Sequence, residues 1–243
     1  MKDILQDVIA HTYGLGCIEL IKVSGTATGT TISAVAEDKS VIVNGVFRTA
    51  VPEFEGVFGM PNLGQLKTVL GFDDYDAAAK LSVQHTTTNG VTAPSSIHFE
   101  TKTGDFVNDY RLMVKAIIED KVKNVSFAGA KWNVEFAPSM AGIMRLKKQW
   151  QANSAEATFT TKIDNGDLRV YFGDPSTHSG NFVFQPSVTG TLTRSWMWPV
   201  KQFISIMDLL GDKTVRISDQ GAAEIVVDSG TAVYTYWLPA QAK

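Results

Sequence analysis

The same order of secondary-structure patterns occurs twice along this chain, and this repetition restricts the possible folds more than any other feature. Each half shows the pattern of a helix, three strands, a second helix and three further strands. The second helices form the plainest pair: they lie in "GVFGMPNLGQLKTVLGFDD" (56–74) and "SWMWPVKQFISIMDLLGDK" (195–213), both amphipathic and both closed by glycine. Because the order is repeated while the residues are not, the sequence predicts two similar α+β domains in tandem.

In the first half, apolar residues at helical spacing predict helices over 2–11 and from Leu63 to Leu70. Asn62 is the expected N-cap of the second helix, and Gly71 is its expected closing glycine. Alternating and β-branched runs predict strands at 17–23, 30–36, 40–48, 79–85, 95–101 and 105–113.

In the second half, a helix is predicted over 139–152, with Ser139 as its N-cap. The inward-facing residues expected on this helix and on the last one are Met140, Ile143, Met144, Trp150, Phe203, Ile206, Met207 and Leu210. The predicted strands are 157–163, 167–173, 181–188, 213–218, 222–228 and 231–238.

The halves are separated by 115–135, a stretch that holds four lysines and isolated apolar residues without a clear period. We expect it to be a connector, partly extended and partly loop. The predicted boundaries are therefore a first domain over 1–114, an interdomain connector over 115–135 and a second domain over 136–243.

Composition narrows the function classes. Cys17 is the single cysteine, so no disulfide can form within the chain, and a reducing, cytoplasmic setting is expected. No apolar run has the length of a membrane span, and Asp3 and Asp7 interrupt the apolar pattern that a signal peptide would need. The formal net charge of −3 shows no global basic excess, so a nucleic-acid partner would have to be met by a local patch.

No catalytic constellation stands out, so we expect a protein that is not an enzyme and needs no metal or cofactor. Asp174, Ser176 and His178 lie close together in sequence, but a turn between two strands accounts for them. "LLGDKT" (209–214) lacks the upstream glycine of a phosphate loop and follows a helix instead of opening one.

The repeated element order resembles the sliding clamps, the ring-shaped processivity factors of DNA polymerases, and most of all the trimeric clamps of T4-like bacteriophages. The stretches that carry the resemblance are 57–72, 198–217 and the tail "VYTYWLPAQ" (233–241). The resemblance implies two tandem clamp domains, and three chains closed head to tail into a ring. Strands would form the outer layer, and helices would line a hole wide enough for double-stranded DNA. Such a clamp tethers the polymerase and performs no chemistry.

Sliding requires attraction to phosphates without base recognition, spread over many cations. By the resemblance, the cations facing DNA would be Lys2, Lys67, Arg145, Lys147, Lys148 and Lys201. Lys147 falls at the boundary of the apolar side of its helix, and Asp3 and Asp7 would repel phosphates. The alternative for each cation is an ordinary solvated helix face.

The family also implies docking of the DNA polymerase and the clamp loader through short peptides bound in an apolar pocket. The expected pocket residues are Trp237, Leu238 and Pro239, near the end of the sequence. The alternative is that Trp237 merely packs on its own sheet.

Closing a ring requires exposed strand edges at both ends of the chain. The candidates are the strands near 105–113 and 181–188, and Pro186 is compatible with an edge position. Two other functions stay open from the sequence: a β-rich structural protein of a virion or tail, and a small enzyme with an unrecognised site. If a phage encodes the chain, its location is the cytoplasm of the infected host cell.

Overall fold

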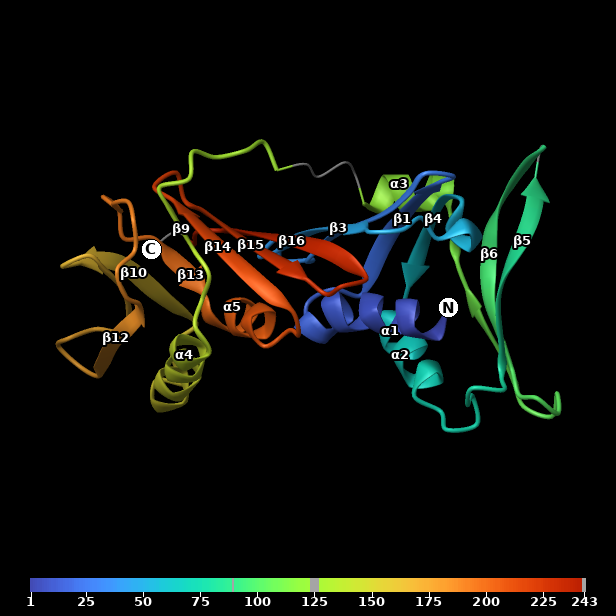
Figure 1. Ribbon diagram of the computed structural model, residues 1–243, viewed down its shortest axis with the longest axis horizontal. Helices are drawn as coiled ribbons and strands as arrows, with labels where there is room; N and C mark the ends of the chain where they lie inside the picture. The colour runs from blue at the N-terminus through green and yellow to red at the C-terminus, as the bar shows by residue number, and fades with distance from the viewer. Residues whose placement is uncertain (89, 123–126, 242–243) are drawn as a thin grey trace. The chain divides into compact units, whose positions relative to one another are not determined.

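The computed structural model describes residues 1–88, 90–122 and 127–241 (Figure 1). The chain divides into two compact units. Unit 1 comprises Met1–Ser126 with Ser229–Tyr234, and unit 2 comprises Phe127–Asp228 with Thr235–Lys243. None of the helices in the described ranges has the length and apolar character that a membrane span needs.

Unit 1 holds three helices, α1 (Lys2–His11), α2 (Leu63–Leu70) and α3 (Lys115–Lys121), and two 3-10 turns, η1 (Tyr13–Leu15) and η2 (Pro52–Phe54). Its strands are β1 (Leu20–Thr26), β2 (Gly29–Val35), β3 (Ile42–Phe47), β4 (Gly56–Pro61), β5 (Lys80–Thr88), β6 (Val91–Glu100), β7 (Val107–Arg111) and β8 (Met113–Val114). They form antiparallel sheets in the orders β8-β4-β1-β2-β3 and β5-β6-β7.

Unit 2 holds α4 (Met140–Ala152) and α5 (Val200–Met207). Its strands are β9 (Val134–Phe136), β10 (Thr158–Asp164), β11 (Asp167–Gly173), β12 (Ser179–Gln185), β13 (Met197–Pro199), β14 (Asp212–Ser218), β15 (Ala222–Asp228) and β16 (Ala232–Pro239), whose first residues belong to unit 1. The sheet orders are β16-β15-β14-β9 and β12-β11-β10-β13.

The hydrophobic core of each unit contains the apolar side chains that point to one face of its strands. In unit 1, β1 pairs with β2 in a register that sets Val23 opposite Ile32, and both side chains are buried. In unit 2, Phe203 of α5 makes edge contacts with Phe159 and Phe184, at ring-centroid distances of 5.1 and 6.1 Å. In unit 2, α5 therefore packs on apolar side chains of β10 and β12.

The predicted α+β fold is confirmed, but several short elements were not predicted from the sequence. β4 contains Gly56, Gly59 and Pro61, residues that weaken a strand prediction. The first part of the expected connector is a helix, α3, and not extended chain or loop. Within α3 only Ile118 is buried, in space left by the missing side chain of Gly59, so no helical period is visible.

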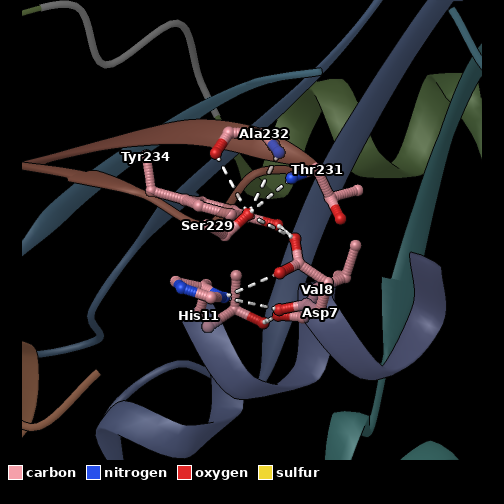
Figure 2. A network of polar contacts seen from close by, with 8 residues as sticks. Asp7, Val8, His11, Ser229, Thr231, Ala232 and Tyr234 are labelled. Carbon is pink, nitrogen blue, oxygen red and sulfur yellow. Dashed lines mark hydrogen bonds and ion pairs between the residues drawn. The ribbon is translucent and has the colours of Figure 1, made fainter. Parts of the chain in front are cut away.

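A polar network ties α1 to the segment Ser229–Tyr234 within unit 1 (Figure 2). The Asp7 carboxylate accepts hydrogen bonds from the Tyr234 hydroxyl at 2.8 Å and the Ser229 hydroxyl at 3.2 Å. The His11 ring stacks on Tyr234 with a centroid separation of 4.4 Å, and its Nδ1 lies 3.4 Å from Asp7 Oδ1. The side chain of Asp7 is 13 % exposed, so the expectation that it would face phosphates is wrong: the carboxylate serves the fold.

Replacing Asp7 with Ala should lower the free energy of unfolding by about 2–3 kcal/mol, because two hydroxyl groups lose a charged acceptor in a largely buried place. Asp3→Ala, at an exposed position of the same helix, is the matched control and should change stability by no more than about 0.5 kcal/mol. Denaturant unfolding of the two variants measures the difference. Equal stabilities would show that the network does not hold α1 in place.

Candidate nucleic-acid interface

Two of the expected DNA-facing cations belong to unit 1 and contact uncharged groups. Lys2 Nζ donates to the carbonyl oxygen of Tyr75 at 2.5 Å. Lys67 is exposed on α2, with Nζ 5.5 Å from the centroid of the Tyr13 ring. Neither contact neutralises the positive charge. α1 and α2 pack against each other, so both cations belong to one helical layer (Figure 1).

In unit 2, α4 carries Arg145 and Lys148 on its exposed surface. Ser139 is the N-cap of this helix, as the sequence predicted, and its hydroxyl accepts a hydrogen bond from the Gly142 N–H at 3.1 Å. A Cβ at Gly142 would lie 2.3 Å from the carbonyl oxygen of Phe184, so this glycine lets α4 lie directly on β12. The position of both cations on the outer surface therefore follows from close helix–strand packing.

The cations of α4 and α5 differ in their surroundings. Lys147 pairs with both carboxylate oxygens of Asp208, the nearer at 2.8 Å, so its charge is already matched within unit 2. Arg145 lies at the flank beside β12, with Nη1 3.5 Å from the carbonyl oxygen of Val183. Lys148 and Lys201 are exposed, and the structure records no partner for either among residues 1–88, 90–122 and 127–241. Of the four cations predicted to face DNA on α4 and α5, Lys147 alone has a carboxylate partner among the described residues.

Part of the predicted apolar face is wrong. Met140 and Met144 are 73 % and 48 % exposed, whereas Ile143 is buried as predicted, together with Gly142 and Leu146. The rotation of the helix is set by the close approach at Gly142, which sequence periodicity does not encode. Leu210 is 86 % exposed, because α5 ends at Met207, before the glycine that was expected to close it.

One of the three residues predicted to form the partner pocket does not reach the surface. Leu238 is fully buried, so its side chain offers no surface to a peptide and belongs to the sheet core. Trp237 is half-buried, and its Nε1 donates to Glu224 Oε2 at 2.8 Å. Pro239 is exposed at the end of β16. Trp237 and Pro239 are therefore the residues of this expected set that reach the surface.

Two edge strands match the segments proposed for ring closure. β7 and β12 each lie at the end of their sheet's order among the described strands. β12 ends at Gln185, directly before Pro186. Along β7, the Leu112 N–H and the Phe106 carbonyl bond to the backbone of 95–101. By alternation, the N–H groups of Val107, Asp109 and Arg111 point away from β6, toward the open edge.

A histidine bridges β6 and β7 on the surface of this sheet. His98 Nδ1 lies 2.8 Å from Asp109 Oδ1, and its Nε2 lies 3.4 Å from Glu100 Oε2. The hydrogen bond with Asp109 raises the pKa of His98, which the charge of Glu100 also favours. The protonated imidazole therefore helps to hold β7 to β6.

Because the pKa of His98 is raised in the folded protein, protonation of its imidazole stabilises the fold. This contribution is complete below the ordinary histidine pKa of about 6.5 and is lost as the pH rises through the folded-state pKa. His98→Gln should therefore lower stability more at about pH 5.5 than at about pH 9. Urea unfolding of both proteins at the two pH values tests this. A stability deficit that does not change with pH would contradict a protonated bridge.

The residues considered for catalysis lie in structural settings. Asp174 Oδ1 accepts from both the backbone N–H and the hydroxyl of Ser176 at 2.7 Å, which is the geometry of a turn. Burial raises the pKa of the Cys17 thiol to about 11, with a smaller contribution from Asp38, so the thiol form prevails at neutral pH.

Comparison with solved structures identifies the fold. PCNA from Thermococcus kodakaraensis superposes with a TM-score of 0.69 at 12 % identity, over 99 % of this chain and 97 % of its own. PCNA from A. fulgidus, solved with the C-terminal region of FEN-1 bound, gives 0.67 at 12 % identity, over 100 % and 95 % of the two chains. Proliferating cellular nuclear antigen from Entamoeba histolytica gives 0.69 at 12 % identity, over 99 % and 94 %.

These three structures are sliding clamps of the PCNA type. No protein-family model matches the sequence. A search of curated proteins found no match either. The fold is therefore that of a sliding clamp over the whole chain, recognised by structure and not by sequence identity.

Proposed function

We propose that this protein is a sliding clamp that encircles double-stranded DNA and tethers a replicative DNA polymerase. The observation that carries the proposal is the superposition of both repeats, over 99 % of the chain, on PCNA. A clamp acts by topology, so its residues need to form a ring and a weakly attractive lining, and no catalytic site is required.

The ring is proposed to contain three chains, each contributing two domains. β7 of one chain would pair with β12 of the next, because both present an open edge and lie in different units. A head-to-tail contact of this kind closes into a ring when its rotation fits a cyclic symmetry. We also propose that the two domains span 1–114 and 136–243 and are joined by the connector 115–135.

The lining is proposed to consist of Lys2, Lys67, Arg145, Lys147, Lys148 and Lys201. Support comes from the exposure of Lys67, Arg145, Lys148 and Lys201 on helices. Lys147 is the weakest member, because Asp208 already neutralises it. Non-specific phosphate contacts from such residues hold DNA without fixing a sequence, which sliding requires.

The proposed protein partners are a DNA polymerase and a clamp loader. The A. fulgidus clamp was solved with the C-terminal region of FEN-1 bound, so one clamp of this fold binds a protein segment. For this chain we place partner docking on the surface of Trp237 and Pro239. Membership of the T4-like bacteriophage type, and a location in the cytoplasm of an infected cell, rest on the sequence resemblance.

Light scattering at high protein concentration tests the ring. One chain has a mass of 26.4 kDa, so a closed trimer should give about 79 kDa. A mass that stays near that of one chain on concentration would contradict the ring and would favour a β-rich structural protein of a virion or tail.

A further inference from the structure

The outer edge of β5 in unit 1 has no neighbouring strand among those that the structure describes. The sheet order β5-β6-β7 places β5 at one end, and Figure 1 shows it at the outer side of its sheet. Its pairing with β6 is regular from Lys80 to Gln84, where a bulge interrupts it. An edge strand of this kind presents backbone donors and acceptors that another strand can use.

The pairing of β6 determines which backbone groups of β5 point to the open edge. Ser95 in β6 and Thr101, directly after it, bond through their backbones to the β7 side. Odd-numbered residues of β6 therefore pair with β7, and even-numbered ones pair with β5. Ser82 lies opposite an even-numbered residue and so bonds to β6. By alternation, the N–H and C=O groups of Leu81 and Val83 point to the open edge.

In unit 2, the corresponding edge is covered by a strand. β14 follows the second helix of its repeat and pairs with β15, just as β5 follows α2 and pairs with β6. On its other side β14 pairs antiparallel with β9, in a register that sets Val215 opposite Phe136 and Ile217 opposite Val134. All four side chains are buried. The segment β9 is therefore an example, within this chain, of the strand that such an edge accepts.

Without a covering strand, an apolar pair of unit 1 is incompletely buried. Leu81 and Val83 point to the inner face of their sheet, where Leu81 lies opposite the buried Phe99. Both are only half-buried. Val215 and Ile217, the corresponding pair on β14, are 0 % and 2 % exposed. A strand added to β5 would bury this apolar pair and so gain hydrophobic free energy besides its hydrogen bonds.

The polar face of the same edge favours an acidic residue in the added strand. In unit 2, the central residue of β9, Glu135, pairs with Arg216 of β14 at 2.7 Å. In unit 1, Lys80 lies on the same face of β5 as Ser82, and its side chain is 67 % exposed although its Nζ lies 3.7 Å from Glu100. An acidic side chain opposite Ser82 would approach Lys80 diagonally across the two strands.

We propose that the edge of β5 binds an extended segment of a partner protein, which adds to the sheet as an antiparallel strand and carries an apolar, an acidic and an apolar residue in succession. Its backbone bonds to Leu81 and Val83, its apolar side chains cover this pair, and its acidic side chain faces Lys80. In strand addition, main-chain hydrogen bonds give affinity and alternate side chains give selectivity. The proposal does not rest on the clamp function, and it leaves β7 and β12 free for ring closure.

The test uses the full-length protein and a labelled peptide of residues 133–137, acetyl-Asn-Val-Glu-Phe-Ala-amide. At saturation, hydrogen exchange at the amides of Leu81 and Val83 should slow at least about 10-fold, because each amide gains an acceptor. The same peptide methylated on the backbone nitrogens of its valine and phenylalanine should bind at least about 10-fold more weakly, because it has lost two donors. A peptide with serine at both apolar positions should also bind more weakly.

A pair of protein variants tests the same edge from the other side. Val83→Pro removes one outward donor and should weaken binding at least about 10-fold. Val83→Ala also loses the valine side chain but keeps the N–H, and it should stay within about 3-fold of the unaltered protein. Thermal unfolding of both variants is measured first. If Val83→Pro does not fold, the methylated peptide on the unaltered protein decides the question.

No protection of Leu81 and Val83 at about 1 mM peptide, or equal binding of the methylated peptide, would overturn the proposal. Protection confined to β7 or β12 would overturn it as well, because the peptide would then occupy the edges assigned to ring closure. Light scattering of the same samples reports on the ring separately, and the peptide should leave the mass unchanged. A single chain that still protects β5 contradicts the clamp alone, and a trimer without this protection contradicts the strand site alone.

Discussion

Asp109→Pro should convert a trimer of about 79 kDa into single chains of 26.4 kDa. The Asp109 N–H points toward the open edge of β7, where the proposed neighbour strand would accept its hydrogen bond. Proline removes this donor and leaves a carbonyl of the partner strand unsatisfied, at about 1–3 kcal/mol for each of three junctions. The pairing with β6 should survive, because that pairing uses the alternate N–H groups of β7.

Asp109→Ser is the matched control, because it also removes the carboxylate that contacts His98 but keeps the N–H. It should remain trimeric by light scattering. If both variants stay trimeric while folded, β7 is not the edge that closes the ring. If both dissociate, the carboxylate and not the strand edge holds the junction.

Replacing Arg145 and Lys148 with glutamate should weaken DNA retention strongly while leaving the trimer intact. Two replaced cations in each of three chains amount to six in the proposed ring. Because each phosphate contact contributes about −0.9 to the slope of log affinity against log salt, the slope should become shallower by up to about 5. The side chains of both residues are exposed, so the fold should tolerate the change.

The control variant is Lys121→Glu/Lys162→Glu, which makes the same charge change at exposed positions of α3 and β10. It should keep the original salt slope, since neither position belongs to the proposed lining. Affinity for duplex DNA over a series of salt concentrations gives both slopes. Identical slopes for the two double variants would mean that net charge and not the α4 surface governs binding.

The helices that carry the repeat were predictable because their apolar residues follow a regular period. α1 spans Lys2–His11 and α2 spans Leu63–Leu70, as the spacing indicated. Some strands were predictable from their alternating and β-branched residues: β11 and β15 occupy the predicted ranges. Repeated order, and not any motif, was the signal for the fold.

The features that could not be predicted from the sequence depend on contacts between residues that lie far apart along the chain. The face that α4 presents is set where Gly142 meets Phe184, and Asp7 is drawn inward by Tyr234. The pairing of Lys147 with Asp208 joins residues that are far apart along the chain, so the period of a single helix does not predict it. Phe127 and Trp132 carried no periodic signal, and the stacking of Phe127 between Trp132 and Trp237 follows from the fold of unit 2.

The most direct test of encirclement uses topology. The protein is threaded onto a linear duplex at high concentration, both DNA ends are blocked with bulky proteins, and unbound protein is removed in high salt, which screens phosphate contacts. The duplex is then cut between the blocks, and the protein that stays on the DNA is measured. A closed ring should persist through the salt wash and leave once the cut provides free ends. Loss during the wash despite blocked ends, or retention after the cut, would contradict a clamp that holds DNA by surrounding it.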